Sequence, residues 1–223
     1  MNFWSQALVI ARRDLRIEAR AGEVTGVILP FAAIAVFVVP LATDTLTVRL
    51  ADLGWPVYWL VSLLFGMSVA LRNSATESPT QRRHLLLLGV DPVARFAGRA
   101  GAAAVLMIAV MSVTAPLMVL FYDPDGLPPI ALWAGVVVLF STGLAMLATL
   151  AGDVTVGLRA RSMLAPLLVA PLAVPLVVGS ARAVESVGRG TSTLGPLMLL
   201  VIADLGLAIS AIVTAQPLEE ATT

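Results

Sequence analysis

The side chains that could bind a partner or take part in chemistry gather in one polar segment between hydrophobic stretches, residues 72–99. Within it, residues 79–88 combine basic and polar side chains with a run of leucines. The residues of interest are Gln81, Arg82, Arg83, His84 and Leu86. Arginines are strong donors to anions, and leucines gain free energy by burial. This combination is typical of a helix that another surface holds, and it lacks the paired groups of a catalytic site.

Local signals predict a short helix here. Ser78 suits an N-cap, Pro79 suits the first helical position, and Gln81 completes a capping box. Gly89 suits the end of that helix. The Asp91-Pro92 pair then repeats the start signal, so we expect a second helix that continues into the next hydrophobic stretch.

Other chemistry has little support in the sequence. His84 is the only histidine, and the chain has no cysteine, so we expect no metal site. The basic residues are all arginine, which excludes a Walker A lysine and therefore a conventional ATP site in this chain. No Ser-His-Asp set or pair of buried carboxylates is visible, and we expect no enzymatic activity. A formal net charge of zero gives no indication of a nucleic-acid partner.

The composition is that of a membrane protein. Hydrophobic residues make up 59% of the 223 residues, and charged residues only 13%. We expect an all-α polytopic membrane protein that forms a single domain over residues 1–223. Six apolar segments are long enough to cross a hydrocarbon core of roughly 30 Å. They are residues 24–43, 53–71, 100–122, 129–152, 162–181 and 194–215.

The distribution of arginine predicts the orientation. Eleven of the fourteen arginines fall in the N-terminal segment and in the connections on the same side, against three on the other side. Because positive charge is retained in the cytoplasm, we expect both termini and residues 72–99 there.

The N-terminal segment, residues 1–22, is predicted to be an interfacial helix. Trp4, Leu8, Ala11 and Leu15 share an apolar stripe, next to a face of arginines. An aromatic-anchored stripe beside a basic face suits a helix that lies on an anionic membrane surface. A helix packed on another subunit is the alternative.

Two further features of the spans are candidates for function. Asp204 interrupts the last span, and a carboxylate at that depth is costly unless protein or water stabilises it. Pro166, Pro171 and Pro175 fall in the fifth span, where each removes a backbone hydrogen bond and permits a kink. We expect Asp204 to face protein or a water-filled seam between helices or subunits rather than lipid, and the prolines to form a hinge.

The order of these features resembles the haem exporter protein B (CcmB) family. The resemblance rests on the basic N-terminal run at residues 11–20, the leucine run with Gly-Val-Asp-Pro at 85–92, the Thr-Val-Gly-Leu-Arg stretch at 155–159, and the prolines at 164–175. It covers essentially the whole chain.

The resemblance implies an ABC-2-type exporter permease in the bacterial inner membrane. Such a subunit dimerises and works with a separate cytoplasmic ATP-binding cassette subunit, so residues 79–88 would be the coupling helix seated on that ATPase. A helix resting on lipid headgroups is the alternative. The family's other partners are a haem-handling membrane subunit and a haem chaperone. Haem is then a transported or handled ligand of the complex and is not covalently bound. An export permease for a lipid, glycan or drug, or a membrane scaffold without an ATPase, remains open as a different function.

Overall fold

The computed structural model describes residues 2–43, 49–75, 89–155 and 161–220. Within these residues all regular structure is helical. Five helices are long and apolar enough to cross a membrane, and a sixth span results if one bent pair of helices is counted as a single crossing. The chain is therefore a multi-pass membrane protein by composition and helix length.

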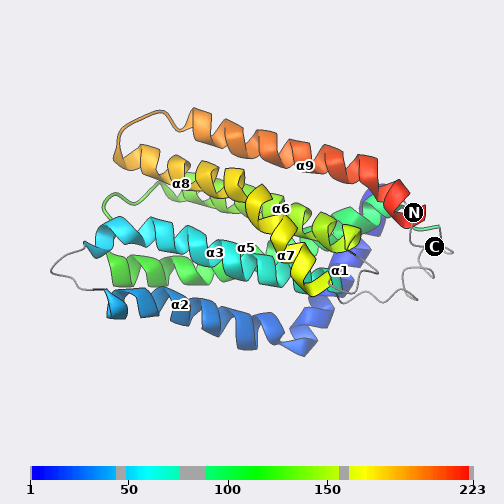
Figure 1. Ribbon diagram of the computed structural model, residues 1–223, viewed down its shortest axis with the longest axis horizontal. Coiled ribbons are helices and arrows are strands. Elements are labelled where there is room, and N and C mark those ends of the chain that lie inside the picture. Colours follow the sequence, from blue (N-terminus) through cyan, green and yellow to red (C-terminus); the bar gives the residue numbers. More distant parts are fainter. Residues whose placement is uncertain (1, 44–48, 76–88, 156–160, 221–223) are drawn as a thin grey trace.

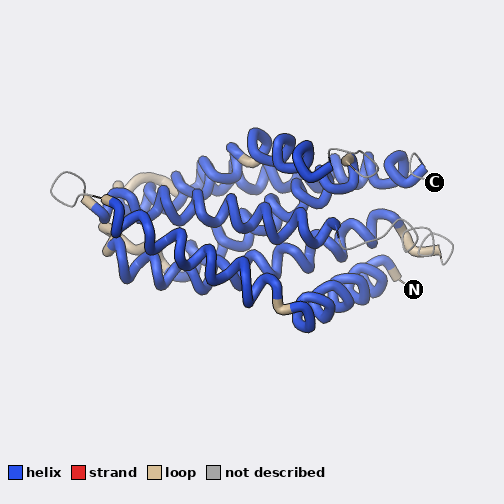
Figure 2. Tube along the Cα trace, turned by 60° about the horizontal axis from the view of Figure 1, so that its bottom comes forward, coloured by secondary structure: helices blue, strands red, loops and turns tan. Residues whose placement is uncertain are grey.

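The N-terminal part consists of a separate helix and the first span. Helix α1 (Phe3–Ala21) ends at Gly22, whose left-handed conformation (φ 66°) lets the chain turn sharply. A π-helical turn, η1 (Val24–Ile28), leads directly into α2 (Leu29–Ala42). Figure 2 shows the short loop at this elbow between α1 and the first span.

The centre of the bundle is built from α3 (Leu50–Ala75), α5 (Pro92–Tyr122) and α6 (Ile130–Val154). Large side chains from these helices interlock without access to solvent, among them Tyr58, Met107, Phe140 and Leu144. The start of α5 follows the signal in the sequence, because the Asp91 side chain accepts a hydrogen bond from the backbone N–H of Val93. A proline at the first position needs no such partner.

The C-terminal part contains α7 (Arg161–Leu172), α8 (Val174–Gly188) and α9 (Leu194–Glu220). Helices α7 and α8 form a bent pair, with an angle of 41° between them at the break at Ala173. Helices α2 and α9 leave most of their apolar side chains exposed within this single chain. Lipid or other subunits must cover these surfaces in a membrane.

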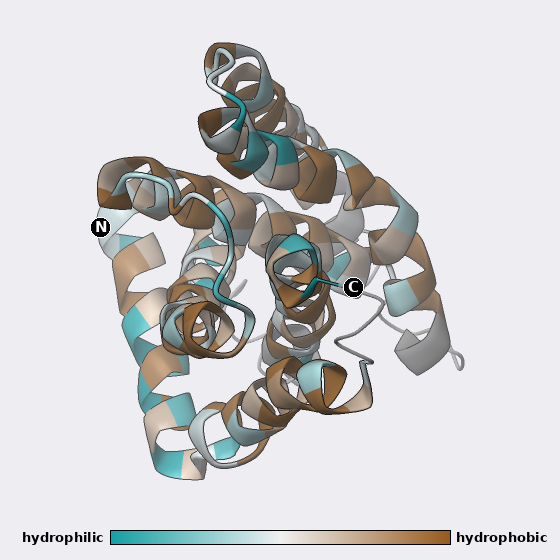
Figure 3. Cartoon of the chain, turned by 90° about the vertical axis from the view of Figure 1, so that its left-hand side faces the viewer, coloured by the Kyte–Doolittle hydropathy of each residue, from teal (hydrophilic) through white to brown (hydrophobic). Residues whose placement is uncertain are grey.

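The spans lie side by side along the long axis, and both termini lie at the same end of the bundle (Figure 1). Helix α1 crosses that end at a steep angle to the spans. In the view along the bundle axis α1 is seen from the side, with hydrophilic and hydrophobic residues alternating along it (Figure 3). The start of α3 and the loops after α5 and after α8 lie at the opposite end (Figure 1).

Several helices run beyond the apolar segments expected from the sequence. The third apolar segment, residues 100–122, lies within α5, whose start at Pro92 agrees with the helix start expected at Asp91-Pro92. Arg95 and Arg99 lie in this first part of the helix and are buried. The fourth was placed at 129–152 and its helix runs on to Val154. In both cases a charged residue is held by protein contacts, which a hydropathy profile does not register.

The fifth span also differs from the expectation. It was placed at 162–181, with a polar connection after it, yet α8 continues to Gly188. Glu185 in its last turn pairs with Arg189, four residues on, and Gly190 (φ 64°) ends the segment. Hydropathy alone does not distinguish an exposed, polar last turn of a helix from a loop.

Candidate functional site

The residues predicted to contact a partner ATPase lie outside the described part of the chain. They are Gln81, Arg82, Arg83, His84 and Leu86, and they connect α3 to α5. The end of α3 and the start of α5, which flank them in the chain, belong to the end of the bundle that holds both termini (Figure 1). The described side chains around that end form the first part of the candidate site.

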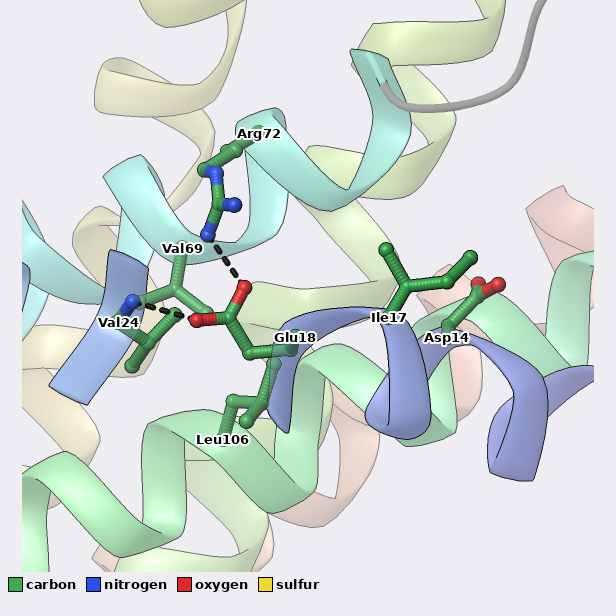
Figure 4. Close-up of a pocket in the computed structure, with 7 residues that line it drawn as sticks. All are labelled: Asp14, Ile17, Glu18, Val24, Val69, Arg72 and Leu106. Atoms are coloured by element: carbon green, nitrogen blue, oxygen red, sulfur yellow. Dashed lines mark hydrogen bonds and ion pairs between the residues drawn. The ribbon is translucent and has the colours of Figure 1, made fainter. Parts of the chain in front are cut away.

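A cluster of three charged residues, Glu18, Glu23 and Arg72, joins α1, the first span and α3 (Figure 4). The Glu18 carboxylate accepts a hydrogen bond from the backbone N–H of Val24 at 2.5 Å, and its other oxygen accepts one from Arg72 at 2.5 Å. Arg72 also forms an ion pair with Glu23. Because Gly22 breaks the helix, the N–H of Val24 lacks an intrahelical partner, and Glu18 supplies one. This charged cluster therefore fixes the elbow between α1 and the first span and links it to the end of α3.

A second charged contact joins α5 to α6 and is almost completely buried. Arg99 donates to Asp153 at 2.8 Å, and their side chains are only 2% and 7% exposed. Each residue lies in a helix whose other inward side chains are mostly small or apolar. A buried ion pair adds little net stability, but it makes the relative position of its two helices specific.

Asp204 lies on α9 against α6, within the apolar part of the bundle. One carboxylate oxygen accepts a hydrogen bond from the Thr142 hydroxyl at 3.0 Å. The other oxygen is buried and has no hydrogen-bond partner among the described residues. A Cβ on Gly143 would lie 2.2 Å from that oxygen and 2.7 Å from a methyl carbon of Leu176 on α8. Gly143 is thus the residue that lets α6, α8 and α9 meet around the carboxylate.

The prolines of the fifth span lie where the crossing bends. Pro166 and Pro171 are inside α7, and Pro175 is in the first turn of α8, on the other side of the break at Ala173. Pro175 cannot donate to the carbonyl of Pro171, so the regular hydrogen-bond ladder is interrupted here. The bend places Leu176, just after the break, against Gly143 next to Asp204.

An open apolar groove of about 470 Å³ lies between the start of α1 and helices α5, α6 and α9. Small residues on α5, including Ala97 and Gly101, form part of its wall, and Phe3 and Trp4 border it. Thr142, the partner of Asp204, also lines it. The groove is therefore an apolar surface that includes the polar side chain of Thr142.

The described charged side chains of this site make contacts between helices. Among the described residues no group of three or more His, Cys, Asp or Glu side chains could hold a metal ion. The charges are used to connect helices: Glu18 to Arg72, and Arg99 to Asp153.

Comparison with known proteins decides the family. The family model described as CcmB protein matches residues 5–220, from the first helix to the last. The chain belongs to the CcmB family. It is 32% identical over 191 residues to the heme exporter protein B of Rhodobacter capsulatus, covering 84% of this chain and 86% of the relative. It is 31% identical over 204 residues to the heme exporter protein B of Paracoccus denitrificans, covering 88% of each chain.

Sequence reasoning missed most of the contacts that build the site. Asp153 falls just outside the apolar segment 129–152 and Arg99 just outside the segment 100–122, and neither was expected to form a buried ion pair. The burial of Glu18 at the end of α1 was not predicted either. One signal in the sequence could have indicated these contacts: each charged residue lies within a turn or two of a strongly apolar segment. A charged side chain in that position needs a partner from another helix.

Proposed function

We propose that this CcmB-family chain is the membrane permease subunit of an ABC transporter complex for cytochrome c maturation. In this proposal a separate cytoplasmic subunit hydrolyses ATP, and the complex exports haem or releases a haem-loaded chaperone. The observation that carries the proposal is the family match, which extends over residues 5–220 and so includes every described helix. The two relatives are both named heme exporter protein B.

The remaining parts of the complex follow from the same family assignment. The proposed partners are the ATP-binding cassette subunit, a second copy of this chain, a haem-handling membrane subunit and a haem chaperone. The proposed location is the bacterial inner membrane, with both termini in the cytoplasm. The arginine bias supports this orientation, since eleven of fourteen arginines belong to the segments on the terminal side.

Residues 79–88 are the proposed contact with the ATPase, on sequence grounds. They connect α3 to α5, and α3 carries Arg72, which forms an ion pair with Glu18 in the charged cluster. A movement imposed on this segment would act on the elbow of α1 and on the start of α5, close to Arg99. The proline break is the proposed hinge that accommodates the movement within the spans.

Co-purification of the ATPase tests whether the chain is an ABC permease or a freestanding scaffold. We expect the tagged chain to retain a nucleotide-binding subunit from solubilised membranes, and Leu86→Asp to lose it while inserting normally. A buried leucine contributes roughly 1.5–3 kcal/mol to a contact, and an unpaired charge in its place costs more. Absence of any ATPase from the unmodified complex would contradict the proposal. Equal retention by Leu86→Asp would instead place the contact elsewhere.

Asp204 is the proposed functional residue within the membrane. Hydrogen bonds between helices in membranes contribute on average only about 0.6 kcal/mol, so its bond to Thr142 explains little stability. Its second oxygen lacks a partner among the described residues, which is a cost rather than a gain. Such a group is retained for a purpose other than stability.

We therefore expect Asp204→Leu to lower cytochrome c output severely at a normal protein level. Thr142→Val is the matched control, because it removes the same hydrogen bond and leaves the carboxylate in place. It should reduce output much less. The measurements are haem staining of c-type cytochromes and immunoblotting of the permease. Full cytochrome c output from Asp204→Leu would show that the carboxylate has no role in transport.

A further inference from the structure

Helix α1 carries a continuous exposed face, whose first residue, Trp4, borders the apolar groove. It consists of Trp4, Leu8, Arg12, Arg16 and Arg20, in which successive members are four residues apart and therefore neighbours on the helix surface. Trp4 is 78% exposed and Leu8 is 51% exposed. The opposite face, which includes Ala7, Ile10, Asp14 and Glu18, is buried. The exposed face thus has an apolar N-terminal half and a basic C-terminal half.

The arginines of this face have no counter-charge in the described part of the chain. The acidic residues of α1 are used elsewhere, because Asp14 pairs with Arg13 and Glu18 pairs with Arg72. Among the described residues none forms an ion pair with Arg12, Arg16 or Arg20, and all three are exposed. The face therefore carries an uncompensated positive charge.

The position of α1 indicates what compensates this charge. The helix lies across the end of the bundle, steeply inclined to the spans (Figures 1 and 3). It contacts α5 near Gly98, and its C-terminal end reaches Arg72 at the end of α3. The charged residues Arg72, Arg99 and Asp153 mark this level as the border of the apolar spans. A helix at this level lies among the lipid headgroups.

We propose that the exposed face of α1 binds the headgroups of anionic phospholipids in the leaflet at this end of the bundle. The guanidinium groups of Arg12, Arg16 and Arg20 pair with phosphate oxygens, for which their planar geometry is suited. Trp4 and Leu8 enter the boundary between headgroups and acyl chains, as interfacial aromatic and aliphatic residues do. This face selects lipid by charge, and the inference stands independently of which cargo the complex moves.

The test measures which lipid lies next to α1 in the full-length protein. Because the chain has no cysteine, Ser5→Cys places a single fluorophore on the exposed side of α1. The protein is reconstituted in phosphatidylcholine vesicles that contain a spin-labelled phosphatidylglycerol or a spin-labelled phosphatidylcholine at the same mole fraction. Stronger quenching by the phosphatidylglycerol probe reports an enrichment of anionic lipid.

We expect anionic lipid to be enriched about fivefold for each arginine that engages a headgroup, and the enrichment to fall as salt is added. Replacing Arg12, Arg16 and Arg20 by glutamine should remove most of it. The matched control replaces Arg49, which directly precedes α3, and Arg182 and Arg189, which lie in α8 and directly after it; these three carry the same total charge. The start of α3 and the end of α8 lie at the opposite end of the bundle from α1 (Figure 1). This control should leave the enrichment unchanged.

Three results would overturn the inference. Equal quenching by the two lipids would show that the face does not select charge. An unchanged preference in the Arg12/Arg16/Arg20 variant would assign the selection to other residues. Protection of the fluorophore from both lipids, in the complex purified with its protein partners, would show that a protein surface covers α1.

Discussion

Arg99→Met is expected to destabilise the protein by about 3–5 kcal/mol, because it leaves the Asp153 carboxylate buried without a cation. Among the described residues Arg99 is the only group that forms an ion pair with Asp153, and the acid side chain is 7% exposed. Methionine keeps much of the volume of arginine, so the loss reports the charge rather than a cavity. The measurement is thermal unfolding of the purified protein in detergent, together with the protein level in membranes.

Two comparisons make this prediction specific. Adding Asp153→Leu to Arg99→Met removes the stranded charge and should recover much of the lost stability. Arg49→Met breaks the exposed pair with Asp125, whose side chains are 70% and 72% exposed, and should cost less than about 1 kcal/mol. If Arg99→Met were as mild as Arg49→Met, the buried pair would not hold α5 against α6.

Gly98→Ala is expected to separate α1 from the bundle. A Cβ at this position would lie 2.6 Å from the carbonyl oxygen of Ala7 and 2.9 Å from the Cβ of Ile10. These atoms belong to the backbone and the stem of a side chain, so they cannot turn away, and α1 must shift. Overpacking of this kind costs about 1–3 kcal/mol. We expect a cysteine introduced at Ile10, which is 5% exposed, to become reactive to a water-soluble thiol reagent.

Gly101→Ala is the control for this substitution on the same helix. A Cβ at Gly101 meets nothing within 4 Å, and alanine favours a helix over glycine by roughly 0.5–1 kcal/mol. The control should therefore be neutral or slightly more stable, with the cysteine at position 10 still protected. A cysteine that stays equally protected in Gly98→Ala would mean that α1 does not depend on this close approach.

The sequence predicted the parts of the fold that depend on local signals. Apolar length located the helices that are long enough to span a membrane, the Asp91-Pro92 pair located the start of α5, and the prolines indicated the bend between α7 and α8. Each of these features is determined by residues close together in the chain. The helices run beyond the apolar segments where a charged residue belongs to a helix, as Asp153 does.

Contacts between distant segments could not be predicted. Glu18 meets Arg72, and Arg99 meets Asp153, each across 54 residues. Nothing in a single sequence says which arginine meets which carboxylate. The same limit applied to α1, where the apolar stripe through Leu8 was visible, but the buried face is the one that carries Ala7 and Glu18. Which face of α1 is buried depends on the close approach of Ala7 to Gly98 and on the pairing of Glu18 with Arg72, both of which involve residues far away in the sequence.

The most direct test of the proposed function measures covalently attached haem in c-type cytochromes of a strain that lacks this chain. The proposal predicts that haem staining of these cytochromes is lost, while their apoproteins are still made, and that a plasmid copy of the chain restores it. Normal cytochrome c in the strain that lacks the chain would contradict the central claim that this CcmB-family protein is a permease subunit for cytochrome c maturation.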